Sequence, residues 1–196
     1  MFKISELRQN LLGSLEIGLF MSKGAQRFAA DKTTMKKSFI VPALGLPLTL
    51  MMVLGAHSET LNQPVTNILI TIYSLRLVLY LSLFSSLVYV MARKIDQLKN
   101  FCRFITANNW LMLPSVLLMI WPVIGLVSGH YVWADIQPLV AMLTLYSFAC
   151  TAFMMTHVLR IPWELAGFAA ISGLAIHQTS LDVLKWVATS ALYVVN

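Results

Sequence analysis

The sequence predicts an all-α fold: a polytopic membrane bundle of about five transmembrane helices, preceded by an amphipathic helix at the membrane interface. Two observations predict this class. The chain of 196 residues is 58% hydrophobic and only 11% charged, which is about half the charged fraction of a soluble domain. Its apolar runs are continuous and long enough for the ~20 helical residues that cross a bilayer, whereas membrane-spanning strands show short alternating segments.

Residues 1–37 are predicted to form a cytoplasmic amphipathic and basic segment. Its apolar residues recur at helical spacing: Ile4, Leu7, Leu11, Leu15 and Leu19. A helix of this kind lies in the cytoplasmic interface, or it docks on the protein's own spans or on a partner subunit, and the pattern allows both. Lys32, Lys36 and Lys37 then form a basic collar, which suits a bilayer with anionic headgroups.

Residues 38–196 are predicted to form one transmembrane domain. Its five spans are expected at about residues 38–57, 66–92, 104–128, 136–160 and 165–194. The last span is the least regular, because His177, Asp182 and Lys185 interrupt it. Pro162 favours a helix that starts after it, while residues 178–180 offer a weak point. One tilted helix and a short helix followed by a span are both compatible with this stretch.

Lysine and arginine are sorted between alternate connections. Seven precede the first span: Lys3, Arg8, Lys23, Arg27, Lys32, Lys36 and Lys37. Further basic residues follow the second and fourth spans: Arg93, Lys94, Lys99, Arg103 and Arg160. The loops after the first and third spans hold none. The positive-inside rule then places the N-terminus in the cytoplasm and the C-terminus outside. We attribute the net charge of +6 to this topology and to lipid headgroups, and we predict no nucleic-acid partner.

Arg76 is the only charged residue between Glu59 and Arg93. An arginine at membrane depth needs a partner or an exit to the interface. Counted from Val65, Arg76 lies about 16 Å along the second span. Asp182 lies about 18 Å from the end of the fifth span, and therefore at a similar depth.

We therefore expect a structural polar cluster inside the bundle, in which Arg76 pairs with Asp182 and Lys185 lies one turn beyond Asp182. Two alternatives stay open at this point. Arg76 snorkels to the outer headgroups, or it lines a path for an ion or a substrate.

Small residues predict close helix packing at two places. Gly125 and Gly129 form a G-x-x-x-G pair at the outer end of the third span, and Ala169 and Gly173 form a similar pair in the fifth. Such residues let two helix backbones approach closely. We expect packing within the chain, with a dimer interface as the alternative.

The sequence predicts no catalytic centre, metal site or cofactor. His57 and His130 are expected at the outer boundary as interfacial residues, because no third ligand accompanies them. Ser128 and His130 are two residues apart in an outer loop, and we expect them not to face each other. The chain is therefore not expected to be an enzyme.

Residues 103–110 read Arg-Phe-Ile-Thr-Ala-Asn-Asn-Trp. This stretch resembles the start of the third span in bacterial Yip1-like integral membrane proteins. Lys37-Ser38-Phe39 with Pro47, and residues 181–184, are similar to other segments of that family. The resemblance covers about residues 15–195, and it implies five spans and a bacterial inner membrane. Arg76 and Lys185 depart from it, because apolar residues are expected there.

The resemblance implies little about function, because bacterial relatives are labelled transporters or have no assigned role. Asn108, Asn109 and Trp110 are expected at the cytoplasmic interface, where tryptophan anchors at headgroup level. We expect a non-enzymatic membrane scaffold or accessory subunit, which forms a homo- or hetero-oligomer.

The alternative function is a small oligomeric transporter or channel with a polar path near Arg76, Asp182 and Lys185. A transporter should contain a hydrated cavity lined by one of these residues or by His177. A scaffold should be a dry bundle.

Overall fold

The computed structural model describes residues 3–195 and the side chains of residues 3–190, and its regular structure in this range is helical. The seven α-helices are α1 (Ile4–Gly18), α2 (Lys32–Ser38), α3 (Ile40–Ala56), α4 (Gln63–Lys94), α5 (Leu98–Val127), α6 (Trp133–Val158) and α7 (Trp163–Val195). Two 3-10 helices, η1 (Ser22–Arg27) and η2 (Ser58–Thr60), lie in the connections. The predicted all-α class is confirmed.

Four helical segments in the described part of the chain are long and apolar enough to cross a membrane: Lys32–Ala56, which joins α2 and α3, and the helices α4, α5 and α6. This length and composition are those of an integral membrane protein. The fifth predicted span is also a helix, and α7 runs without a break from Trp163. The polar residues at 177, 178, 182 and 185 lower the mean hydropathy of α7, so α7 is not among the four segments that are apolar enough to cross a membrane.

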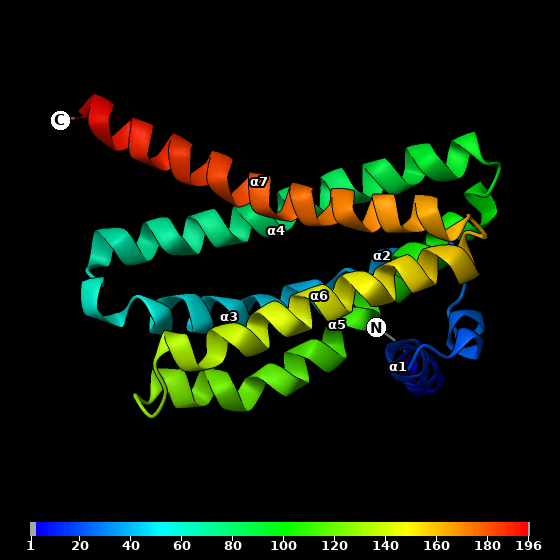
Figure 1. The fold of residues 1–196 in the computed structure, drawn as a ribbon, viewed down its shortest axis with the longest axis horizontal. Helices are drawn as coiled ribbons and strands as arrows, with labels where there is room; N and C mark the ends of the chain where they lie inside the picture. Colours follow the sequence, from blue (N-terminus) through cyan, green and yellow to red (C-terminus); the bar gives the residue numbers. More distant parts are fainter. Residues whose placement is uncertain (1–2, 196) are drawn as a thin grey trace.

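The five long helices form a closed ring. The helix α3 packs on α5, α5 on α6, α6 on α7, α7 on α4, and α4 on α3. Figure 1 shows α4 and α7 running together on one side of the bundle, with α3, α5 and α6 on the other. A ring of five helices leaves a central space, which side chains either fill or leave open.

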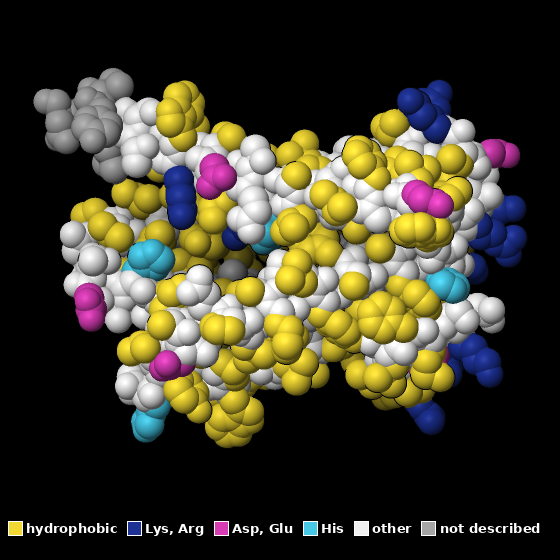
Figure 2. All heavy atoms as spheres, in the orientation of Figure 1, with side chains coloured by type: hydrophobic (Ala, Val, Ile, Leu, Met, Phe, Trp, Pro, Cys, Tyr) yellow, Lys and Arg dark blue, Asp and Glu magenta, His cyan; other side chains and the backbone are white. Residues whose placement is uncertain are grey.

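Basic residues gather at one end of the bundle. On the face drawn in Figure 2, most of the lysine and arginine side chains lie at the end where α4 and α6 finish. We call this the basic end. The turns at the far end, residues 57–62 and 128–132, contain neither residue type. The charge sorting along the sequence therefore becomes a separation in space.

The helix α1 lies crosswise to the long helices near the basic end, and Figure 1 shows it end-on. It packs on η1, α5 and α6 with its small and polar side, because Asn10, Gly13, Ser14 and Ile17 are its buried residues. Its leucine-rich side faces outward, with Leu15 54% exposed. The amphipathic helix thus docks on the spans and still presents an apolar surface.

Polar contacts fix this N-terminal segment to the bundle. Arg103 Nε donates to the Phe28 carbonyl at 3.0 Å, and the Tyr146 hydroxyl donates to the Gly18 carbonyl. Within the segment, Arg27 forms an ion pair with Glu16. The Arg27 guanidinium lowers the pKa of the Glu16 carboxyl.

Side chains fill the basic half of the bundle. Its core includes Phe84, Phe104, Met154 and Met155, all 1% exposed or less. The far half holds a much smaller buried cluster of Met119, Val123 and Leu143. The central space therefore stays open in the far half.

The two predicted small-residue pairs have different roles. Ala169 and Gly173 are buried, and a Cβ atom on Gly173 would lie 2.8 Å from the Phe84 ring, so this pair lets α7 approach α4 closely.

The predicted helix packing at Gly125 and Gly129 is corrected. Gly129 lies beyond the end of α5 with φ +77°, and His130 N donates to the Gly125 carbonyl at 2.9 Å. These features are a glycine-capped helix end. The atoms nearest to Gly125 on its open side belong to the Tyr131 ring, because the chain turns back directly after it.

Candidate binding cavity

A cavity of about 290 Å³ lies inside the ring, and all five long helices contribute to its wall. Most of the lining is apolar, and it includes Met52, Met112 and Met119. The polar lining residues are Thr49, Tyr80, Asn108, Asn109, Ser115, Thr144, Ser147, Thr151 and His177. No lysine, arginine, aspartate or glutamate occurs among the described residues of the wall. In Figure 2 the surface is hollowed between α7 and α6.

The cavity exists because small side chains replace large ones along the ring. Towards the basic end, Phe104, Met154 and Met155 fill the core, whereas the middle of α5 and α6 presents Ser115, Thr144 and Ser147. Close packing normally leaves few voids larger than a water molecule. A space of this size is therefore a built feature of the fold.

Most hydroxyl groups of the wall are satisfied by their own helix. Thr144 Oγ1 donates to the Val140 carbonyl at 2.7 Å, and Ser147 Oγ donates to the Thr144 carbonyl at 2.9 Å. Thr49 bonds the Gly45 carbonyl in the same way. These bonds to the preceding turn use the single donor of each hydroxyl, so these side chains can only accept a hydrogen bond from a ligand.

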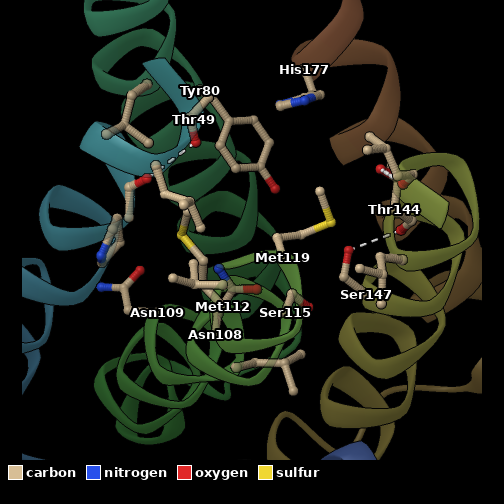
Figure 3. A pocket seen from close by; sticks show the side chains of 18 of the residues that line it. Thr49, Tyr80, Asn108, Asn109, Met112, Ser115, Met119, Thr144, Ser147 and His177 are labelled. Carbon is tan, nitrogen blue, oxygen red and sulfur yellow. Dashed lines mark hydrogen bonds between the residues drawn. The ribbon is translucent and has the colours of Figure 1, made fainter. Parts of the chain in front are cut away.

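Three other polar groups have unused capacity. No hydrogen bond joins the Tyr80 hydroxyl, the Ser115 hydroxyl or the Asn108 amide nitrogen to any residue that the structure describes. The oxygen of the Asn108 amide accepts only a long bond of 3.5 Å from Thr151. Figure 3 shows the Tyr80 hydroxyl pointing into the space between the helices. The cavity thus offers free donors in an apolar, uncharged environment.

Aromatic contacts set the direction of Tyr80. Its ring stacks on Phe84, with centroids 5.6 Å apart and an interplanar angle of 9°. The His177 ring meets it edge-on at 5.2 Å and 81°. Two neighbours from α4 and α7 therefore hold the tyrosine in place before any ligand arrives.

The predicted ion pair between Arg76 and Asp182 is not formed. The ion pairs within the described part of the chain are Arg27–Glu16 and Lys37–Glu6. Arg76 Nε instead donates to the His177 carbonyl of α7 at 3.2 Å, and its guanidinium carbon lies 5.6 Å from the centroid of the Tyr73 ring.

The helical geometry of α7 explains this correction. Asp182 lies five residues after His177, so its side chain points about 140° away from the side that His177 turns toward the cavity. Asp182 and Lys185 are both exposed on the outside of the helix. The expected cluster of three charged residues therefore divides into a half-buried Arg76 and two exposed side chains.

The depth of Arg76 depends on which end of α4 is used as the origin. The helix has 32 residues and is about 48 Å long, well above the ~30 Å of a hydrocarbon core. Counted from Arg93 at the basic end, Arg76 lies about 26 Å along the helix, close to the opposite boundary. Snorkelling to the outer headgroups is compatible with this position and stays a prediction.

Asn108, Asn109 and Trp110 do not lie at a headgroup interface. Asn109 and Trp110 are only 2% and 3% exposed, and Asn108 lines the cavity. Asn109 Nδ2 donates to Ser38 Oγ at 2.9 Å, which joins α5 to α2. The prediction is wrong because α5 begins at Leu98, and the N-terminal segment covers its first half.

Ser128 and His130 do face each other, contrary to the sequence-based expectation. Ser128 Oγ and His130 Nδ1 are 2.8 Å apart, because the positive φ of Gly129 folds the chain back between them. The pair is exposed, and Ser128 also donates to the Gly125 carbonyl. Within the described residues, no three histidine, cysteine, aspartate or glutamate side chains gather as metal ligands.

No protein-family model matches the chain, and neither a curated protein nor a solved structure matches it. The resemblance to Yip1-like proteins therefore stays a prediction that rests on short segments. The site must be interpreted from its own geometry.

Sequence reasoning missed Tyr80, Ser115, Thr144 and Ser147 as site residues. A signal for part of the wall exists in the fourth predicted span. There, Thr144, Ser147 and Thr151 recur at spacings of three and four, which places three hydroxyl groups on one helical face.

Proposed function

We propose that this chain is a non-enzymatic, five-span protein of a bacterial inner membrane that binds a small, lipid-soluble molecule in its central cavity. Of the two function classes expected from the sequence, this is closer to the transporter than to the scaffold. Its site is centred on Tyr80, Ser115 and Asn108, and not on Arg76, Asp182 and Lys185. Of the four residues that the sequence predicted for the wall of a transporter cavity, only His177 lines the observed cavity.

The free donors in the cavity wall carry the proposal. Tyr80, Ser115 and Asn108 each present a polar group without a partner among the described residues to one largely apolar space of about 290 Å³. A molecule that occupies this space would give these groups hydrogen-bond partners. A scaffold with a dry core has no need for either the space or the donors.

The proposed topology keeps the basic end in the cytoplasm, in line with the positive-inside rule. The helix α7 serves as the fifth span because it completes the ring between α6 and α4. Its polar His177 turns inward to the cavity, while Phe168 and Ile171 are exposed as lipid-facing residues should be.

We assign α1 to the cytoplasmic interface of the membrane. One side of the helix is already covered by protein, and its outward side carries Leu7, Leu12 and Leu15 beside polar residues, so the boundary between lipid and water is the fitting environment for that side. Lys3, Arg8 and Lys23 lie on or next to it and suit anionic headgroups.

A role as an accessory subunit of a membrane complex is the second candidate. Asp182 and Lys185 are exposed on α7 one turn apart, next to Trp186, which is 68% exposed. Charges that face hydrocarbon are costly, and a second protein chain on this side of α7 would cover them.

Native mass spectrometry after purification in a mild detergent tests both candidates. We expect the protein to carry a small molecule, and we expect the cavity-filling variant Ser115→Met with Ser147→Met to lose it. Ser86→Met, on the exposed side of α4, is the matched control. Equal occupancy in all three proteins would contradict the binding function. A second chain that co-purifies with each of them would favour the accessory subunit.

A further inference from the structure

The cavity wall also restricts the chemistry of the ligand. We propose that the ligand is a neutral amphiphile: an apolar body with one or more hydroxyl or carbonyl oxygens, each of which accepts a hydrogen bond from Tyr80, Ser115 or Asn108. This inference rests on the proposed binding function and adds the class of molecule that is bound.

The absence of charge in the wall argues for a neutral molecule. All of the described lining residues are apolar, hydroxyl-bearing, amide-bearing or imidazole side chains. Burial of an isolated phosphate, carboxylate or ammonium in such a site would carry a large desolvation penalty without a counter-charge. Arg76, the nearest candidate, donates to a backbone carbonyl and does not line the cavity.

The free donors argue for an oxygen atom on the ligand. Hydroxyl and amide N–H groups bond to carbonyl and hydroxyl oxygens. Asn108 and Ser115 are seven residues apart on α5, so they lie on the same side of that helix, about 10 Å apart along its axis. Tyr80 reaches into the cavity from α4 on another wall (Figure 3). A pure hydrocarbon would leave all three donors unpaired.

The apolar lining and the hollowed face agree with a molecule that arrives from the bilayer. Methionine side chains at 52, 112 and 119 line the cavity, and methionine adapts to apolar bodies of different shape. The hollow between α6 and α7 in Figure 2 faces sideways from the bundle, toward the region that lipid would occupy. The ligand can therefore enter without crossing the basic end.

Binding of chosen probes to the full-length protein in lipid nanodiscs tests the ligand class. Farnesol and ubiquinone-1 represent neutral oxygen-bearing molecules, and farnesene represents the hydrocarbon. Dodecyl phosphate and dodecyltrimethylammonium represent the two signs of charge. We expect farnesol or ubiquinone-1 to bind about tenfold or more tightly than the other three, which corresponds to about one well-formed hydrogen bond.

The variants Tyr80→Phe and Ser115→Ala should each weaken binding of the oxygen-bearing probe several-fold and leave farnesene unchanged. Tyr89→Phe is the matched control, because Tyr89 is exposed and packs against Phe101 away from the cavity. Thermal unfolding of each variant separates a loss of binding from a loss of fold.

Each result supports or overturns the inference. Stronger binding of a charged probe, or equal binding of farnesene and farnesol, would overturn the ligand class and leave the binding function in place. Failure of every probe, together with a purified protein that carries no small molecule, would overturn the binding function as well.

Discussion

The basic half and the far half of the ring are built from the same five helices but are packed differently. In the basic half, Phe84, Phe104, Met154 and Met155 meet in a core that solvent does not reach. From the middle of the ring into the far half, the helices border a cavity of about 290 Å³, with Ser115, Thr144 and Ser147 in its wall. Close packing in the basic half holds the helices together, and this allows the rest of the ring to leave space for a ligand.

The two parts of the ring also differ in whether their polar side chains have hydrogen-bond partners within the protein. In the basic half, Asn109 and Ser38 bond each other across two helices. Nearer the middle of the ring, Tyr80 and Ser115 have no such partner among the described residues, and neither is as deeply buried as Asn109 and Ser38. We interpret the first pair as structural and the second as reserved for a ligand.

The largest loss in the free energy of unfolding is expected from a substitution in the core of the basic half. Phe104→Ala removes a fully buried ring that lies 6.4 Å from Phe84, and truncations of this kind cost about 3–5 kcal/mol. Met119→Ala, at the border of the existing cavity, should cost less than half as much. Reversible unfolding in mixed micelles measures both values. Equal losses would mean that the two halves are packed alike.

A somewhat smaller loss of stability is expected from a substitution where the two halves of the ring join. Gly173→Leu places a Cβ atom 2.8 Å from the Phe84 ring, so either this buried ring or α7 itself must shift, at a cost of about 1–3 kcal/mol. Gly167→Leu is the control, because a Cβ atom there meets nothing within 4 Å. Thermal unfolding should separate the two variants, and an unchanged Gly173→Leu protein would contradict the close packing.

The bond of Arg76 to α7 should contribute about 1 kcal/mol. Arg76→Gln is expected to lower the free energy of unfolding by this amount, whereas Asp182→Asn should have little effect. A double-mutant cycle decides between the observed bond and the ion pair expected from the sequence. A coupling energy above about 1 kcal/mol between the two positions would restore the ion pair.

The smallest effect concerns pH and the N-terminal segment outside the ring. Folding lowers the pKa of Glu16 from 4.5, through Arg27, and the pKa of Asp31 from 3.8, through the backbone N–H of Thr34. Their stabilisation is therefore complete above these ordinary values and is lost as pH falls through the lower folded values.

Hydrogen exchange of residues 4–38 checks this expectation. The protection factors of this segment, which are its exchange rates corrected for the intrinsic pH dependence of amide exchange, should fall below about pH 4, while those in the core of α5 stay constant as an internal reference. Protection factors that fall on raising the pH from 5 to 8 would have the wrong sign for two carboxylates.

The helices were predictable because hydropathy and spacing depend on local sequence. The amphipathic pattern from Ile4 to Leu19 matches α1, and the five predicted spans match the long helices to within three residues at each end, except that α5 begins six residues earlier than predicted. Pro162 correctly indicated the start of α7 after it.

The environment of individual polar residues was less predictable, because it depends on which helices are neighbours. Trp110 has the sequence position of an interface anchor, but the N-terminal segment packs over that part of α5. Arg76 has no local partner in sequence, and its bond is to a backbone carbonyl, which every residue possesses. The cavity results from small residues on several helices, and only the ring arrangement brings them together.

The claim that the far half is open and the basic half closed is tested most directly by cysteine labelling. In a background without Cys102 and Cys150, single variants Ser115→Cys and Thr106→Cys place one thiol in the cavity wall and one in the closed core. We predict that N-ethylmaleimide modifies the first and not the second in the folded protein, and that farnesol slows the modification. Equal protection of both thiols, before and after bound lipid is washed out, would contradict the account.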